Sequence, residues 1–403
     1  MAKTFFVLWL LLAPAAFSGE VKEVDNSRHP VGKVFTLQLE EDLRIGPETD
    51  DEHFLWGGLG GTIAVNDQGH MFVVDPANVR IVEADANGVY VRDIGGQGQG
   101  PGEFQALTSF QILGDGSGVA YEFMGVSGNF SFFDKDMHFR ERKAVASPGL
   151  FLTSCLLSAN GEMNFSLTAK VNQAESKIDM TYMLLDKEHQ VKAQLLTFDQ
   201  PIPTPQTFST KEGLIKLMAK QFGVFAQGNF CYAVFGSDHV YTATANRYEI
   251  TKWDADFNKT MVIRKEYKPI AQGEDEIYAI IDPIYEALQG RLPPNLQAIF
   301  TRNTLGKAME LAEFPSSKHP INGLNLLKDG ILVVVHNTNV PGKKMVSDLF
   351  SKEGKFLGSF EQTLSGNVGL YTSVFKGDFF YNMEVNEDGE TSVVRYKYKL
   401  VAK

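Results

Sequence analysis

The chain contains only two cysteines, Cys155 and Cys231, among its 403 residues. So few thiols exclude a scaffold that is held together by several disulfide bridges. We expect two separate buried thiols, although an oxidising compartment would let them pair if their strands were adjacent. The fold must therefore be stabilised mainly by apolar packing, for which 43% hydrophobic residues are sufficient.

Basic residues are also scarce, with 38 Lys and Arg against 49 Asp and Glu and a formal net charge of −11. An acidic chain is poorly suited to bind nucleic acid or an anionic membrane. We expect neither partner, and no insertion into a membrane. The apolar run from Phe5 to Ala13 follows Lys3 and precedes small residues, which is typical of a secretory signal peptide. We assign residues 1–18 to it and expect an exported protein, periplasmic or extracellular.

Familiar catalytic and metal signatures are missing as well. The sequence has no His-Glu-x-x-His, no Gly-x-Ser-x-Gly and no Cys-x-x-Cys, which excludes the common zinc and serine hydrolase motifs. The stretch from Asp254 to Asn258 resembles the start of a calcium-binding loop, but Lys259 stands where glycine is required and Lys265 where glutamate is required. An ordinary hairpin turn is the better interpretation, and we expect no metal and no cofactor.

What the chain does have is glycine, concentrated in IGGQGQGPGEF at residues 94–104. Glycine and proline at this density predict an ordered turn and not a helix or strand interior. A dinucleotide-binding loop does not fit, because a Gly-x-Gly-x-x-Gly pattern that starts at Gly96 or Gly98 ends at Pro101 or Glu103. The turn therefore connects structural units and does not bind phosphate.

The residues before this turn, 63–94, form short β-rich runs separated by turn residues, which predicts four strands. Asp75, Asn78 and Arg80, followed by the glycine-rich turn that ends at Phe104, resemble one repeat of the NHL type. Such repeats form the blades of six-bladed β-propellers. The chain resembles most the secreted bacterial propellers of this kind, and the resemblance implies a fold much more than an activity.

Internal repetition extends this interpretation to the rest of the chain. The turn of a first hairpin recurs six times, at intervals of 47, 45, 77, 92 and 47 residues; the markers are Gly69, Gly116, Gly161, Asp238, Gly330 and Gly377. Three intervals correspond to one blade each. The two long intervals contain helix-forming residues with apolar spacing of three and four, which predicts helical inserts at about 205–224 and 272–312.

The last repeat has only three strands, the third at 391–400, whereas 34–39 is a strand without a hairpin partner. We predict that this N-terminal strand completes the last blade, since closure removes the exposed edges of an open ring. The fold class is therefore all-β, a six-bladed β-propeller over 32–403, preceded by an N-terminal extension at 19–31.

In propellers, ligands bind on the face that carries the loops between second and third strands and the loops between blades. Alternatively, they bind at the mouth of the central channel. The candidate ligand-binding residues on these loops are Asn78, Arg80, Phe104, Arg247, His336, Asn337, Asn339 and Tyr371. His336, Asn337 and Asn339 form the chemically richest group, because imidazole and amides offer directional donors and acceptors. The alternative is a polar loop that satisfies its own backbone, and Asn78 and Arg80 fit a loop-bracing role.

Two functions of different classes lead, and a purely scaffolding role in a surface complex, with the helical insert at 274–309 as the docking element, is a third. The first is an exported, monomeric, noncatalytic protein that binds a protein, peptide or glycan on one face of the ring. The second resembles propeller lactonases or lyases, in which calcium or zinc at the central channel activates water. The predicted inner strands are almost free of carboxylates, which favours the binding protein.

Overall fold

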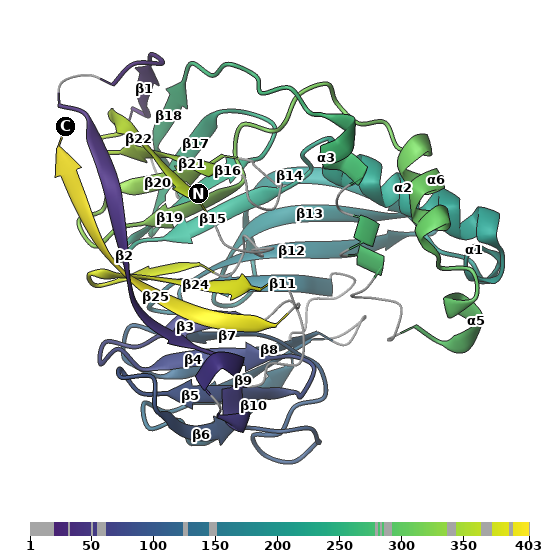
Figure 1. The fold of residues 1–403 in the computed structure, drawn as a ribbon, viewed down its shortest axis with the longest axis horizontal. Helices are drawn as coiled ribbons and strands as arrows, with labels where there is room; N and C mark the ends of the chain where they lie inside the picture. The colour runs from purple at the N-terminus through teal and green to yellow at the C-terminus, as the bar shows by residue number, and fades with distance from the viewer. Residues whose placement is uncertain are drawn as a thin grey trace, which may run out of the picture.

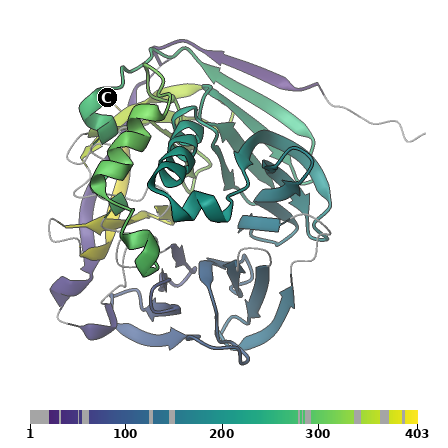
Figure 2. The same cartoon turned by 90° about the vertical axis from the view of Figure 1, so that its right-hand side faces the viewer.

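The computed structural model describes residues 20–30, 33–49, 51–54, 62–123, 128–144, 151–278, 281–282, 284–285, 292–336, 344–363, 373–386 and 390–402. Six sheets are arranged around one axis (Figures 1 and 2). Four of them are formed by four consecutive strands, and the other two each contain a strand from the N-terminal segment. This arrangement confirms the predicted six-bladed β-propeller with helical inserts.

The first three blades each contain four antiparallel strands. Blade 1 consists of β3 (Ile63–Val65), β4 (Met71–Asp75), β5 (Arg80–Ala84) and β6 (Tyr90–Ile94). Blade 2 consists of β7 (Leu107–Ile112), β8 (Gly118–Phe123), β9 (Gly128–Phe133) and β10 (Phe139–Ala144). Blade 3 has the longest strands, β11 (Phe151–Leu157), β12 (Met163–Asn172), β13 (Lys177–Asp186) and β14 (Val191–Pro201).

The other three blades complete the ring. Blade 4 consists of β15 (Cys231–Phe235), β16 (His239–Thr244), β17 (Glu249–Asp254) and β18 (Lys259–Lys265), with β1 (Lys22–Asn26) added at its outer edge. Blade 5 consists of β19 (Gly323–Leu326), β20 (Leu332–Val335), β21 (Lys344–Phe350) and β22 (Phe356–Thr363). Blade 6 consists of β23 (Val374–Lys376), β24 (Phe379–Val385), β25 (Thr391–Ala402) and β2 (Phe35–Ile45). Cys155 and Cys231 lie in different blades and are free thiols.

The N-terminal strand closes the ring as predicted. β2 pairs antiparallel with β25, so that Phe35 lies opposite Ala402 and Ile45 lies opposite Val393. Figure 1 shows the purple β2 beside the yellow β25, so that an N-terminal strand and the C-terminal strand lie in one sheet. After β2 come two short 3₁₀-helices, η1 (Pro47–Thr49) and η2 (Glu52–Phe54), and the chain then enters blade 1.

Each blade is buried on both sides, which explains why its strands have continuous apolar runs. On β4, Phe72 and Val74 pack toward blade 2 with Phe110, whereas Val73 packs toward blade 6 with Tyr381. Alternate residues of a strand point to opposite faces of its sheet, so one strand supplies two neighbouring cores. The apolar packing that stabilises the ring is therefore distributed over the interfaces between neighbouring blades.

The turns between third and fourth strands repeat one design. In blades 1, 2 and 4 an aspartate carboxylate accepts hydrogen bonds from the backbone N–H groups two and four residues later, at Asp85, Asp134 and Asp254. The residue three positions after the aspartate has a positive φ, 81° at Gly88 and 63° at Phe257. The carboxylate of Asp254 thus stabilises a hairpin turn.

The helical inserts both leave the ring on the side of the interblade connections. The first contains α1 (Pro205–Ser209) and α2 (Lys211–Ala226), and the second contains α3 (Glu274–Tyr278), α5 (Pro294–Gln297) and α6 (Arg302–Leu311). They share an apolar core that includes Phe222, Phe300 and Leu305. Figure 2 shows the described helices of the inserts in front of one part of the ring, away from the blue strands of blades 1 and 2. No helix of the described residues is long and apolar enough to cross a membrane.

We expect Gly95→Ala to destabilise the protein by about 2–4 kcal/mol, as measured by urea unfolding. Gly95 has φ +76°, and a Cβ atom there would lie 2.1 Å from the ring of Phe104 and 2.9 Å from the carbonyl of Gly102. Gly96→Ala is the matched control, because no atom lies within 4 Å of its Cβ position. Equal stability of both variants would show that the glycine-rich turn does not depend on this close packing.

Candidate functional site

We call the side of the ring that carries the helices the insert face. Because strands alternate in direction, the loops between second and third strands open on this same side. The sequence-predicted ligand residues belong to these loops and to the connections between blades.

In blade 1, Asn78 and Arg80 donate hydrogen bonds to a buried carboxylate. Asp75, at the end of β4, is 1% exposed. Its Oδ2 accepts hydrogen bonds from Asn78 Nδ2 at 2.7 Å and from Arg80 Nε at 3.2 Å. Arg80 also donates to Asp93 at 2.9 Å and to the carbonyl of His53 at 3.1 Å. These contacts brace the loop between second and third strands.

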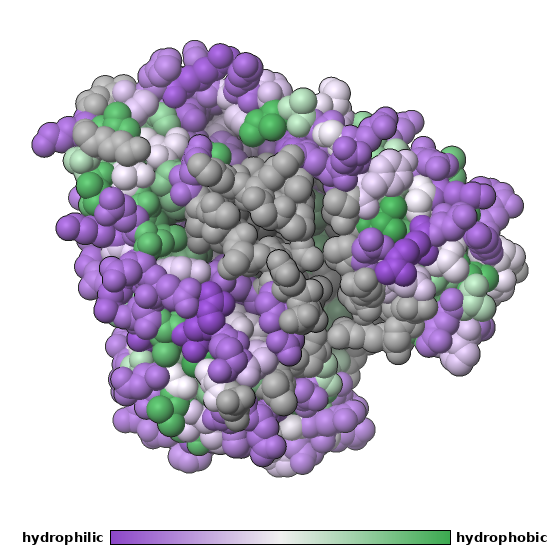
Figure 3. Space-filling model, in the orientation of Figure 1, coloured by the Kyte–Doolittle hydropathy of each residue, from purple (hydrophilic) through white to green (hydrophobic). Residues whose placement is uncertain are grey.

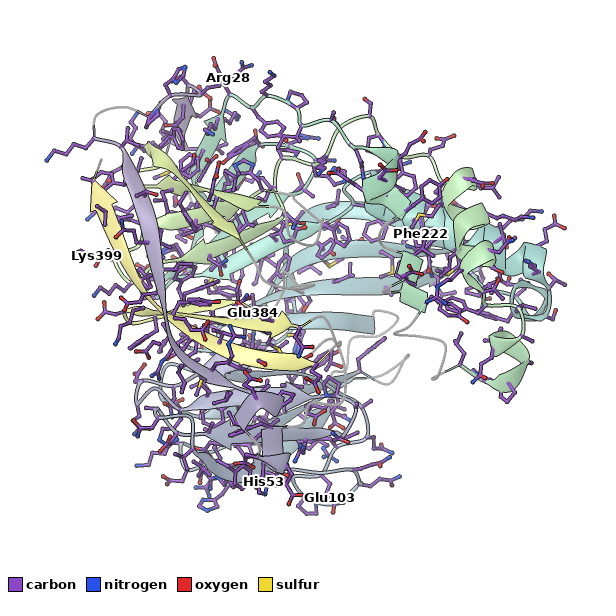
Figure 4. The ribbon with its side chains drawn as sticks, viewed as in Figure 1. Arg28, His53, Glu103, Phe222, Glu384 and Lys399 are labelled. Carbon is purple, nitrogen blue, oxygen red and sulfur yellow. The ribbon has the colours of Figure 1, made fainter. Side chains whose placement is uncertain are left out.

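Blades 2 and 6 repeat this arrangement with other residues. Glu122 accepts the backbone N–H of Gln105 at 2.7 Å, and Arg142 lies 3.5 Å from its other oxygen. Glu384, labelled in Figure 4 on β24, pairs with Arg44 at 3.0 Å and accepts the hydroxyl of Tyr396. Buried carboxylates at the insert-face end of the second strand are thus matched by a basic side chain in three blades.

Blade 5 departs from this pattern and contains the densest buried polar group. Nε2 of His336, just after β20, lies 2.8 Å from Oδ2 of Asp348 on β21. Lys265 of blade 4 donates to the same oxygen at 2.7 Å, and Tyr248 of blade 4 donates its hydroxyl to it. The ring of Tyr267 lies parallel to that of His336, with centroids 6.0 Å apart. We call these five residues the seam cluster, because they join blades 4 and 5.

The charge of the seam cluster is centred on Asp348, which is 1% exposed. Burial alone would raise the pKa of its carboxyl, but His336 and Lys265 outweigh that effect and hold the pKa well below its usual range. Burial and the neighbouring carboxylate raise the pKa of Tyr248 well above 10.0. At neutral pH Asp348 is therefore ionised, and Tyr248 is a neutral donor to it.

Three atoms at the edge of the seam cluster are buried without a hydrogen-bond partner, among the residues that the structure describes: Nδ1 of His336, Nδ2 of Asn322 and the hydroxyl of Tyr267. Asn322 lies beside His336, because its backbone N–H donates to the carbonyl of Val335 at 2.7 Å. An imidazole fixed by a carboxylate through one nitrogen can accept a proton at the other. His336 is only 5% exposed, however, so no reactant reaches that nitrogen in this conformation.

The remaining predicted residues do not converge on this cluster. Phe104 is fully buried and packs near Phe133, so its ring belongs to the core between blades 1 and 2. Arg247 is exposed at the turn between β16 and β17. Asn337, Asn339 and Tyr371 lie outside the described residues. The structure thus brings together Asn78 with Arg80 in blade 1 and places His336 elsewhere, in blade 5.

Sequence reasoning missed Tyr248, Lys265, Tyr267 and Asp348. Their positions are distant in the chain, and none forms a motif with another. One signal was present, because Asp348 is the one charged residue at 345–350, where only Ser347 is polar besides it. A charge inside a strand that is buried on both faces must have a partner, and that requirement identifies such a residue as a member of a buried network.

Two further features of the described residues have weaker chemistry. Asp134, Asp136 and His138 offer ligand atoms within 4.8 Å of one another, but they form a hairpin turn on the side opposite the insert face, and Arg140 already pairs with Asp134. A shallow pocket of about 410 Å³ lies between the end of β14 and the helices α1 and α2. Threonine and apolar side chains dominate its lining, without a buried charged group.

Comparison with known proteins agrees with this architecture. A family model described as a 6-bladed beta-propeller, DUF5128, matches residues 45–272. A search of curated proteins gives no match. A Bacteroides fragilis NCTC 9343 protein, provisionally named an exported protein, has 11% identity and a TM-score of 0.51, with 94% of this chain and 100% of that chain covered. This likeness shows the fold alone.

Two other solved structures are more distant. A member of the DUF4221 family from Bacteroides vulgatus ATCC 8482 has 10% identity and a TM-score of 0.46, with 91% of this chain and 99% of that chain covered. The PQQ-bound aldose sugar dehydrogenase of Streptomyces coelicolor has 10% identity and a TM-score of 0.44, with 92% and 100% covered. At these scores neither structure informs the activity of this chain.

Proposed function

Because this chain belongs to the DUF5128 family of six-bladed β-propellers, we propose that it is an exported, noncatalytic binding protein that holds a protein partner against its insert face. The signal-like sequence at residues 1–18 supports export. The two helical inserts enlarge one face of the ring.

The distribution of exposed apolar side chains carries this proposal. Eight large hydrophobic residues of the described part are exposed, and five of them lie on the inserts, at their base, or on the long hairpin of blade 3 beside them. These five are Val171, Phe208, Ile270, Tyr278 and Leu311. Figure 3 shows hydrophobic residues among hydrophilic ones on the lobe that the helices form. Exposed apolar groups that gather on one face are typical of protein interaction sites.

The charged groups of the same face support binding without catalysis. The buried carboxylates Asp75, Glu122, Asp348 and Glu384 each contact a basic side chain. A general base needs a carboxylate within reach of the substrate, and a metal ligand needs one that faces the ion, whereas these four carboxylates face basic side chains of the fold. Their observed contacts fit a role in stabilising the loops that present the binding face.

We expect the double variant Tyr278→Asp/Leu311→Asp to lose its partner while it keeps its fold. Both side chains are exposed, at 41% and 61%, so the ring does not depend on them, whereas charges would disfavour an apolar interface. The measurement is chemical crosslinking in an envelope extract of the source organism, followed by mass spectrometry. Val89→Asp is the matched control, since Val89 is 60% exposed on the opposite side of the ring.

The expected result is one protein that is crosslinked by the wild type and by Val89→Asp, and at least about tenfold less by the double variant. Equal crosslinking by all three proteins, or loss only in Val89→Asp, would contradict the insert face as the binding surface. Binding of the wild type to a glycan array without a protein partner would replace the protein with a glycan ligand.

A further inference from the structure

The second helical insert has a closed base, where the chain leaves the ring at Ile270 and returns to it at Lys318. The backbone N–H of Lys318 donates to the carbonyl of Ile270 at 2.8 Å. The backbone N–H of Gln272 donates to the carbonyl of Ser316 at 3.1 Å. The side chains of Lys318 and Glu276 add an ion pair at 2.7 Å, and they are only 7% and 16% exposed. This base therefore fixes the start of α3 relative to the segment that follows α6.

The pairing brings the start of α3 close to the end of α6. Glu274 is two residues from Gln272, and Glu313 is three residues from Ser316. At about 3.8 Å per residue, the backbone of Glu274 lies within about 8 Å of Gln272, and that of Glu313 lies within about 11 Å of Ser316. The helices α3 and α6 are also in contact with each other. Their residues at this end therefore belong to one region of the insert face.

Exposed apolar and acidic side chains occur together in this region. Three of the exposed large hydrophobic residues lie here, at 38%, 41% and 61% exposure, and three exposed carboxylates accompany them. We call these six residues the base patch: Ile270, Tyr278, Leu311, Glu274, Glu310 and Glu313. None of the three carboxylates forms an ion pair among the residues that the structure describes. Lys268 is the one exposed basic residue in 266–278 and 310–318, so the patch is acidic.

The end of α6 concentrates this negative charge. The carbonyl end of a helix carries a partial negative charge, which favours basic residues in the last turn. α6 has no basic residue there and has Glu310 instead, and Glu313 follows shortly after the last helical residue, Leu311. A basic group of a partner would offset these like charges, whereas an anionic lipid surface would be repelled.

We propose that the base patch binds a segment of the partner protein in which lysine or arginine residues are interspersed with apolar residues. This inference rests on the proposed function and specifies the chemistry of the partner. Tyr278 and Leu311 supply the apolar anchors, since a few such side chains contribute most of the binding energy of an interface. The carboxylates supply the selection, because complementary charges favour one partner and like charges reject others.

The test reverses the charge of the base patch and keeps its apolar residues. A photoreactive amino acid at position 307, one turn before Leu311 on α6, is placed in the wild type and in Glu310→Lys/Glu313→Lys. After irradiation in an envelope extract of the source organism, mass spectrometry identifies the crosslinked protein and segment. The variant is expected to give at least about tenfold less adduct. In the wild type, the crosslinked segment of the partner is expected to contain several lysine or arginine residues.

Glu188→Lys/Asp256→Lys with the same photoreactive residue is the matched control. It makes an equal change of charge at two exposed turns between third and fourth strands, on the side opposite the insert face. This control is expected to give as much adduct as the wild type.

If Glu310→Lys/Glu313→Lys is unfolded by circular dichroism, salt replaces it as the variable. An increase from 0.1 M to 1 M salt shortens the Debye length from about 10 Å to about 3 Å, so the wild-type adduct should decrease at least about threefold.

Equal adduct in the wild type and in the folded Glu310→Lys/Glu313→Lys would overturn the inference and leave the insert face as the binding surface. A lipid adduct, or a crosslinked segment without basic residues, would overturn it as well. Absence of any adduct in the wild type would instead contradict the proposed function, and the inference with it.

Discussion

A chain that starts at Gly46 is expected to lose cooperative unfolding, because it lacks the strand that closes the ring. β2 contributes the buried side chains of Leu37 and Ile45, which are 5% and 2% exposed. Each such side chain stabilises a fold by about 1.5–3 kcal/mol, and the paired edge of β25 would be exposed in addition. Domains of this kind have only about 5–15 kcal/mol of total stability, so the loss removes most of it.

The measurement is thermal unfolding followed by circular dichroism. A chain that starts at Gly32 is the control, since it lacks β1 but keeps β2, and it is expected to melt in one cooperative transition. If the chain that starts at Gly46 melted at the same temperature as the full-length protein, the closing role of β2 would be refuted.

The variant Asp348→Asn is expected to lose about 3–5 kcal/mol of stability at pH 7. The substitution keeps the shape of the side chain but leaves the largely buried ammonium of Lys265 without its counter-charge. It also removes the carboxylate that orients His336 and accepts the hydroxyl of Tyr248. Urea unfolding measures the effect. Asp238→Asn is the control, because that carboxylate is exposed beside His239, and it should change stability by less than about 0.5 kcal/mol.

The same residue predicts a dependence on pH. The pKa of Asp348 is lower in the folded protein than the ordinary value of an aspartate carboxyl, so the folded state favours the ionised form. The resulting stabilisation is complete above the unfolded pKa of about 3.9 and is lost as the pH falls through the lower folded pKa. The stability difference between wild type and Asp348→Asn should therefore shrink below about pH 4. If the stability difference stayed constant between pH 7 and pH 2, Asp348 would be excluded as the group that causes the pH dependence.

The ring could be predicted because its signals are local. Each first hairpin has its own turn residues, such as Gly69 and Gly116, and four of the six blades come entirely from one stretch of chain. The closing strand was predictable for a related reason, since the last repeat lacked one strand and 34–39 had no partner. β1 was not predictable, because five mostly polar residues with one apolar side chain have no strand pattern of their own.

The seam cluster shows the opposite situation. Tyr248, Lys265, His336 and Asp348 come from four strands or strand ends of two blades, and only the ring places them around one carboxylate. The sequence indicated His336 because of its polar neighbours in the chain. Its observed partners are instead Asp348, Tyr248 and Tyr267. Asn78 and Arg80 were easier, because their partner Asp75 lies within five residues.

Photo-crosslinking from single positions tests the proposed function most directly. A photoreactive amino acid at position 311, on α6, is expected to give one discrete protein adduct in cells of the source organism. The same amino acid at position 89, on the opposite side of the ring, is expected to give none. An adduct from position 89 alone, or none from position 311, would contradict a protein partner on the insert face.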